Sequence, residues 1–97
     1  MNMQAIMKQA QAMQKDMIKI RDEVEKKEFT GESNFVSVKI NGKKEVLEVK
    51  IDTDHVDKDD MDMLQDMIVV ALNQAIKKVD DVMEKKMGKF GSIPGLF

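Results

Sequence analysis

The sequence predicts an α+β fold in which a small antiparallel sheet of two to three strands lies between two long helices. Three observations predict this fold. A heptad pattern of apolar residues fills the first quarter of the chain, and an Asn-Gly pair in the middle joins two stretches of strand-forming residues. A second amphipathic stretch of helical period follows it. Because the helices are long for so small a sheet, we expect them to protrude and the protein to form a homodimer.

The 97 residues are enough for one domain, which we expect to span residues 1–90, with residues 91–97 as a flexible tail. Apolar residues make up 42% of the chain and charged residues 35%, which is typical of a folded protein rather than a disordered one. The absence of cysteine excludes a disulfide framework and a thiol nucleophile. No apolar stretch has membrane-spanning length and no signal-peptide pattern is present, so we expect a cytoplasmic protein without a membrane partner.

The net charge of −2 gives no global reason to expect a nucleic-acid partner, but the charges are unevenly distributed. Residues 1–51 carry ten Lys and Arg against eight acids, and residues 76–97 carry five Lys against three acids. Residues 52–75 between them carry one Lys against seven Asp. Both ends are therefore mildly basic around an acidic middle.

The first helix is predicted from Asn2 to about Lys27. Its apolar residues recur at two positions of a heptad, and the stretch contains no Gly or Pro. These residues are Met3, Ile6, Ala10, Met13, Met17, Ile20 and Val24. At 1.5 Å per residue the helix would be roughly 40 Å long. A hairpin of about 17–20 Å cannot cover that length, so part of the helix must pack on another helix.

The hairpin is predicted around Asn41-Gly42, because a two-residue type I′ turn requires positive φ at both central positions. This turn would place Val36 opposite Leu47 and would give one apolar and one polar face. The preceding residues 28–34 form a connector that could add a third strand. Apolar residues expected in the core or in a dimer interface are Val36, Val38, Ile40, Leu47, Val49, Ile51, Leu64, Ile68 and Leu72.

The aspartate-rich residues 53–62 have two interpretations. An EF-hand calcium loop starting at Asp52 would need an oxygen ligand at its fifth position, Gly at its sixth and Glu at its twelfth. The sequence has Val56, Asp57 and Met63 there, so the pattern favours an aspartate-capped helix start and no metal site.

The second helix is predicted from about Lys58 to Met87, ending at Gly88. Its early half is almost continuously apolar, which predicts that it covers the apolar face of the hairpin. Its later half is narrower and more charged, which predicts that it projects beyond the sheet and pairs with the first helix in antiparallel orientation.

Catalysis has little support in the sequence. The single histidine, His55, has Asp54 and Asp57 nearby, but an exposed loop histidine is the simpler interpretation. No glycine-rich phosphate loop and no metal-ligand spacing is present. The ten methionines fall mostly at core positions and are typical of flexible core filling. We therefore expect no enzymatic activity, no cofactor and no small-molecule substrate.

The remaining candidates are lysines near the helix ends. In an antiparallel pair of helices they would gather at one distal tip and could contact DNA phosphates without reading bases. These candidates are Lys8, Lys15, Lys19, Lys77, Lys78, Lys85, Lys86 and Lys89, with Lys39, Lys43 and Lys44 of the hairpin as secondary ones. From charge patterning alone, a solvated face with pairs such as Asp81–Lys85 is the stronger interpretation.

Several short motifs, in order along essentially the whole chain, resemble the YbaB/EbfC nucleoid-associated family. They are residues 7–14 (MKQAQAMQ), Thr30-Gly31-Glu32, Asn41-Gly42, Ile51-Asp52, Met63-Leu64, Asn73-Gln74-Ala75 and Pro94-Gly95-Leu96-Phe97. One departure is Ser33-Asn34-Phe35, where glycines are common in the family. The resemblance implies a bacterial homodimer with helices protruding from a central core. It also implies DNA binding by those helices, with roles in nucleoid organisation and gene regulation.

A rival hypothesis is a helix–hairpin–helix protein-interaction or chaperone-like module whose helix tips grip other proteins. Its feature would be exposed methionines at the tips, namely Met3, Met7, Met83 and Met87.

Overall fold

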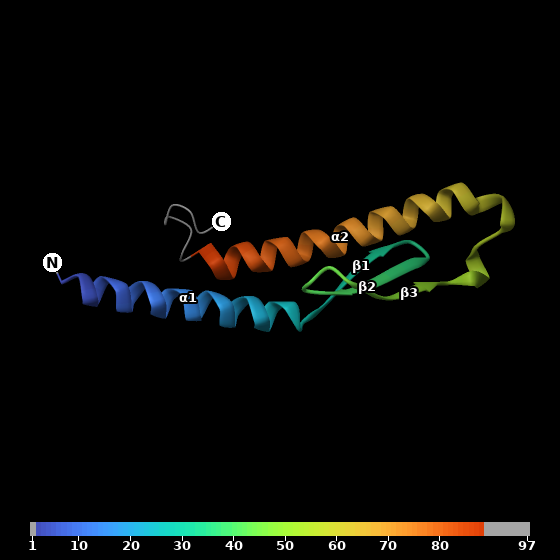
Figure 1. Cartoon of the computed structure of the whole chain (residues 1–97). Helices are drawn as coiled ribbons and strands as arrows, with labels where there is room; N and C mark the ends of the chain where they lie inside the picture. Colours follow the sequence, from blue (N-terminus) through green and yellow to red (C-terminus); the bar gives the residue numbers. More distant parts are fainter. Residues whose placement is uncertain (1, 89–97) are drawn as a thin grey trace.

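The computed structural model describes residues 2–88 and has an elongated α+β architecture (Figure 1). Helix α1 (Met3–Glu25) leads into a sheet of β1 (Glu28–Ser33), β2 (Val36–Asn41) and β3 (Val46–Ile51). Two short 3₁₀ turns follow, η1 (Thr53–His55) and η2 (Lys58–Asp60), and then the long helix α2 (Met61–Met87). This arrangement confirms the predicted fold class. The predicted tail, residues 91–97, lies outside the described residues. Among the helices described, none is long and apolar enough to cross a membrane.

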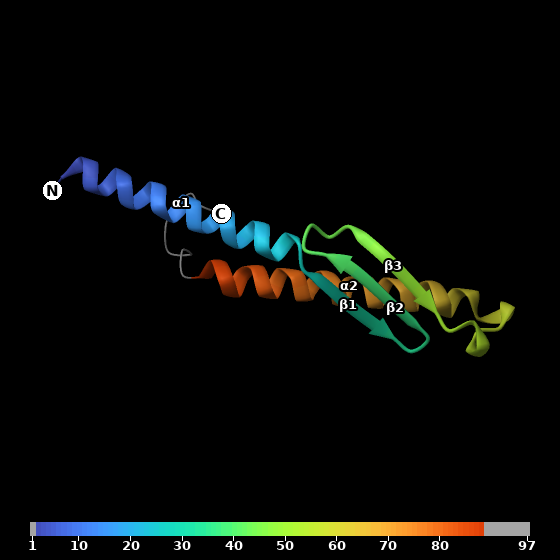
Figure 2. The ribbon, with the colours of Figure 1, turned by 90° about the horizontal axis from the view of Figure 1, so that it is seen from below.

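Helix α1 forms where the heptad predicts it. The Asn2 side chain accepts a hydrogen bond from the backbone N–H of Gln4 at 3.0 Å and so caps the first turn. Met17 is buried against Met87 of α2, which runs antiparallel to α1 in Figures 1 and 2. Met13, Ile20 and Met83 flank this contact. The expectation that part of the first helix packs on the second is therefore confirmed.

The sheet is antiparallel in the order β1-β2-β3, so the predicted connector does contribute a third strand. Strands β2 and β3 pair with Val36 opposite Ile51 and Val38 opposite Val49. Strand β2 alternates buried and half-buried residues, as expected of a central strand with one face against the core. Strands β1 and β3 form the two edges of the sheet.

The predicted two-residue turn is wrong. Asn41 ends β2, its side-chain Oδ1 accepts from the N–H groups of Lys43 and Glu45, and its own N–H donates to the Glu45 carbonyl. Positive φ falls on Lys44, at 67°, and a bulge interrupts the ladder next to Ile40. The longer loop moves the partner of Val36 from Leu47 to Ile51. Because the shift is an even number of residues, Val49 and Ile51 keep the side that was expected of them.

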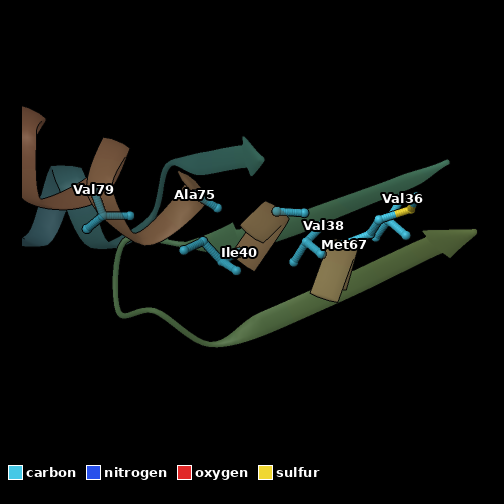
Figure 3. Close-up of a cluster of buried hydrophobic side chains, with 7 residues drawn as sticks. Val36, Val38, Ile40, Met67, Ala75 and Val79 are labelled. Atoms are coloured by element: carbon cyan, nitrogen blue, oxygen red, sulfur yellow. The ribbon is translucent and has the colours of Figure 1, made fainter. Parts of the chain in front are cut away.

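Helix α2 covers one face of the sheet, as predicted, and the side chains between the helix and the sheet form the core (Figure 3). Val38 and Ile40 of β2 are buried in one cluster with Ala71 and Ala75 of α2. Val36, Met67 and Val79 complete the cluster of buried residues, and Ile51, Leu64, Ile68 and Leu72 pack around it half-buried. Leu47 and Val49 are about half exposed (50% and 44%), so in the single chain they lie outside this core. Their role in a dimer interface stays a prediction.

Gly31 sets how closely α2 approaches β1. A Cβ atom at this position would overlap the Ala71 carbonyl and crowd the Ala75 backbone nitrogen. Only glycine therefore fits beneath the helix here, and the two small alanines complete the close approach. This contact fixes where α2 lies along the sheet, and therefore which of its lysines extend beyond it.

The aspartate-rich segment is the start of α2, as the capping interpretation predicted. Asp57 precedes η2, and the Asp60 carboxylate accepts a hydrogen bond from the Asp57 N–H at 3.2 Å. Asp59 and Asp60 lie in this first turn, where the helix dipole favours negative charge. At the other end Gly88 closes α2 with φ −57°, without the left-handed conformation common at such caps.

Candidate nucleic-acid interface

Four lysines form a stripe on the face of α1 that points away from α2. They follow one another at spacings of seven, four and seven residues, so at 3.6 residues per turn they fall within roughly 40° around the helix axis. Met17, which packs on α2, lies on nearly the opposite side of the helix. This lysine stripe consists of Lys8, Lys15, Lys19 and Lys26.

All four side chains of the lysine stripe are exposed, and within residues 2–88 none of them forms an ion pair. Lys15, Lys19 and Lys26 line one shallow depression together with Asp22 and Glu23. Sequence reasoning missed Lys26. The repeated seven-residue spacing was the signal that could have found it, because it places Lys26 in line with Lys19.

The expected gathering of all the lysines at one tip is wrong for two of them. Lys78 lies over the sheet, where its ammonium donates a hydrogen bond to the Thr30 carbonyl of β1 at 2.6 Å. Lys77 lies one residue away and bonds Asp81 at 3.3 Å. The expected Asp81–Lys85 pair is therefore replaced by an Asp81–Lys77 pair. The position of Lys78 follows from the position of α2, because the close contact of α2 with Gly31 of β1 brings this lysine beside Thr30.

Lys85 and Lys86 lie in the last turn of α2, next to the part of α2 that packs on α1. There Lys86 meets Lys27, the residue just before β1. A hydrogen bond with Lys86, and the repulsion of its charge, lower the pKa of Lys27 below its ordinary value. The two amines come from different elements, α2 and the α1–β1 junction. Lys89 lies outside the described residues.

Two of the three hairpin lysines form ion pairs within the protein. Lys44 forms an ion pair with Asp80 of α2 at 2.7 Å, and Lys39 lies 3.8 Å from Glu28 of β1. The first pair ties the hairpin loop to α2 and the second joins two strands of the sheet, and both reduce the positive charge available to a ligand. Lys43 is exposed in the loop.

His55 pairs with a different carboxylate from the two suggested by the sequence. Its Nδ1 lies 2.9 Å from Oδ2 of Asp52, and its ring stacks on Phe35 with centroids 5.6 Å apart. Both polar partners are more than half exposed, with side-chain exposures of 63% and 51%. The pair lies on an open surface and ties the end of β3 to the β1–β2 turn, which is a structural role.

Comparison with known proteins gives one consistent result. Residues 1–93 match the model of the YbaB/EbfC DNA-binding family. A protein named nucleoid-associated protein from Clostridium novyi is 46% identical over all of this chain and 90% of its own length. One of the same name from Alkaliphilus metalliredigens is 43% identical over 99% of this chain and 89% of its own. An uncharacterized protein from Helicobacter pylori has the same fold, with a TM-score of 0.72 at 24% identity over 94% of this chain and 96% of its own.

Proposed function

Because the chain belongs to the YbaB/EbfC DNA-binding family, we propose that it is a non-enzymatic DNA-binding protein that contacts phosphates through the lysine stripe of α1. The observation that carries the proposal is the position of the stripe, on the face of α1 opposite the face that packs on α2. A DNA backbone can reach this face without displacing any part of the described chain. Lysines are point charges for phosphate and carry no base readout, so we expect little sequence preference.

The proposed contact can run along most of α1. The stripe from Lys8 to Lys26 spans roughly 27 Å at 1.5 Å per residue, which is long enough to contact several phosphates of one duplex. Lys27, Lys85 and Lys86 add charge near the C-terminal end of α1. Lys77 and Lys78 make contacts inside the protein and contribute less.

We propose further that the chain acts as a homodimer. Strand β3 is an edge strand whose Val46, Leu47 and Val49 are all about half exposed. Val69 and Val70 on α2 are also exposed, at 56% and 51%. A second copy that covers these side chains would remove apolar surface from water and pair the open edge. The dimer would present two lysine stripes to DNA.

In the cell we propose that the protein is located in the cytoplasm on the nucleoid, where it contributes to nucleoid organisation and gene regulation. The relatives from C. novyi and A. metalliredigens, which carry the name nucleoid-associated protein, support this location.

A titration of a fluorescent DNA duplex across salt concentrations tests the proposal by fluorescence anisotropy. If a dimer neutralises four to six phosphates, log K falls against log salt with a slope of roughly −4 to −5. Duplexes of unrelated sequence should give nearly the same affinities. The absence of binding at low salt, or binding that does not respond to salt, would contradict the proposal.

The rival protein-interaction function has weaker support than the sequence suggested. Met87 is buried and Met83 half-buried in the contact with α1, so neither presents a side chain for gripping another protein. Met3 and Met7 remain exposed, at 73% and 57%. Salt-independent binding to unfolded protein without DNA binding would favour the rival.

A further inference from the structure

The two edges of the sheet differ in how far their backbone groups are already bonded. On β1, the Thr30 carbonyl accepts a hydrogen bond from the Lys78 ammonium at 2.6 Å, and the Glu32 N–H donates to the Gln74 side chain at 2.8 Å. Gln74 and Lys78 lie one turn apart on α2, so the helix that covers the sheet also closes part of this edge. A strand of another chain could not pair there without displacing both side chains.

The edge at β3 is open. The Asp52 N–H donates to the Phe35 carbonyl at 2.8 Å, so the alternation of the ladder directs the backbone groups of Glu48 and Lys50 towards β2 and those of Val49 outwards. Within residues 2–88, no side chain caps β3 in the way that Gln74 and Lys78 cap β1. A strand that extends the sheet therefore adds at β3, which lies along the side opposite β1 (Figure 2).

We propose that two copies of the chain join their sheets at β3, antiparallel, with Val49 directly opposite Val49 of the second copy. The inference rests on the proposed homodimer and adds to it the register of the two strands. Two-fold symmetry places one position of β3 opposite itself. Because residues with outward backbone groups must face each other across the new ladder, this central position is Glu48, Val49 or Lys50.

The charges on β3 distinguish the three registers. When Val49 is central, each Glu48 faces the partner's Lys50, so opposite charges meet at two places. When Glu48 is central, two carboxylates face each other, and when Lys50 is central, two ammonium groups do. Opposite charges that face each other across two strands stabilise the pairing, and like charges destabilise it. Charge complementarity therefore selects the register centred on Val49.

The same register continues the two faces of the sheet. Val49 lies opposite Val38 of β2, whose side chain is buried in the core, so Val49 is on the face that α2 covers. Pairing would bring the two Val49 side chains together and remove apolar surface from water. Glu48 and Lys50 lie on the other face, where the Glu48 carboxylate and the Lys50 ammonium of one chain are 3.2 Å apart. Across the joined strands this face would carry four charges of alternating sign.

Disulfide trapping tests the register in the full chain, which has no cysteine of its own. Three single variants, Glu48→Cys, Val49→Cys and Lys50→Cys, each place one thiol on β3. In the proposed register the two Cα atoms at position 49 lie about 5.5 Å apart, which a disulfide spans, whereas the two copies of position 48 or 50 lie diagonally at about 7–8 Å. We expect Val49→Cys to link two chains under mild oxidation at least ten times faster than either neighbour, as measured on a non-reducing gel.

Each outcome of the trapping decides the question. Faster linkage at position 48 or 50, or equal rates at all three positions, would overturn the proposed register. Sedimentation equilibrium of the parent separates this result from the proposed homodimer. A dimeric parent without preferential linkage at position 49 would remove the register and leave the homodimer standing. A monomeric parent would remove both.

Reversal of the charges gives a second test without cysteines. Glu48→Lys and Lys50→Glu each place like charges opposite one another, so each should weaken dimerisation at least fivefold, although they change the net charge in opposite directions. The combined variant exchanges the two charges and should recover the dimerisation constant of the parent within about twofold. Lys50→Gln removes only weak attractions at exposed positions and serves as the control.

Mixing the two single variants shows whether the repair acts between chains. One chain then carries two lysines and the other two glutamates at positions 48 and 50, so heterodimers should form at least five times more tightly than either homodimer. Single variants as dimeric as the parent, or a combined variant as weak as the single ones, would contradict the proposal.

Discussion

The backbone N–H of Gly42 donates a hydrogen bond to the Glu25 carbonyl at 3.2 Å and ties the hairpin loop to the last residue of α1. Gly42 is buried in this contact, and a Cβ atom there would overlap the Val24 carbonyl and the Glu25 backbone. Helix α1 therefore joins the rest of the molecule through this bond, the short link to β1 and its contact with α2. Together these three connections set the direction in which the lysine stripe points.

The first prediction concerns this contact. Gly42→Ala should lower the free energy of unfolding by about 1–3 kcal/mol, because the added methyl group forces backbone atoms apart. Urea unfolding followed by circular dichroism measures it. Gly88→Ala is the control, since no described residue lies within 4 Å of a Cβ there and the φ of −57° suits alanine. The control should match the parent or exceed it slightly, and an unaffected Gly42→Ala protein would contradict the assigned contact.

The second prediction tests the lysine stripe. Reversing two charges, with Lys15→Glu and Lys19→Glu together, should weaken binding to every duplex sequence alike by at least tenfold and make the salt slope shallower by about 2 per chain. The control is Lys58→Glu, an exposed lysine in the 3₁₀ turn before α2, which changes the net charge by half as much as the double variant. Anisotropy titrations at several salt concentrations compare the affinities and salt slopes of the three proteins. If the control loses half as much binding free energy as the double variant, or more, net charge and not the stripe governs binding.

The third prediction concerns Lys27 and Lys86. Because Lys86 lowers the pKa of Lys27 in the folded protein, the unfolded chain binds more protons between this lowered pKa and the ordinary value of 10.5. At neutral pH the repulsion lowers the free energy of unfolding by its full amount. This effect disappears as the pH rises through that window. Lys86→Gln should therefore raise the urea midpoint at neutral pH. The difference from the parent should shrink as the pH approaches 10.5, and a difference independent of pH would argue against the pair.

The fourth prediction places the dimer interface. Val49→Lys introduces a charge among the exposed apolar residues of β3 and should shift the protein towards the 11.1 kDa monomer. Lys50→Gln, on the other face of the same strand, should leave the assembly unchanged. Sedimentation equilibrium at micromolar concentration measures both. A Val49→Lys protein as dimeric as the parent would move the interface away from β3.

The sequence allowed both helices and the two strands of the hairpin to be predicted, with the third strand as an option, because their signals are local. Heptad spacing, alternation and capping aspartates act within a few residues of one another. The hairpin loop could not be predicted in the same way. Asn41 carries an Asn-Gly signal, yet its side chain closes a longer loop by accepting two backbone N–H groups, and Lys44 takes the positive φ. Asn-Gly indicates a turn near that point without fixing its length.

The lysines show the same difference between local and long-range information. The stripe on α1 follows from spacing within one helix, so three of its four members were candidates from the start. The place of Lys77 and Lys78 depends on where α2 lies along the sheet. The packing of Gly31 under Ala71 decides that position, and these residues are forty apart in the chain. No pattern within one segment could have revealed it.

The acidic residues 52–62 begin at the end of the sheet far from α1, in a molecule 70 Å long (Figure 1). Six aspartates and one lysine lie in this segment, and the lysine stripe lies towards the other end. A polyanion therefore repels one end of the protein and attracts the other before any contact forms. Long-range electrostatic forces favour encounters in which α1 faces the duplex, so the protein has a preferred orientation as it diffuses towards DNA. The aspartates that cap the start of α2 thus also orient the protein in the electric field of a polyanion.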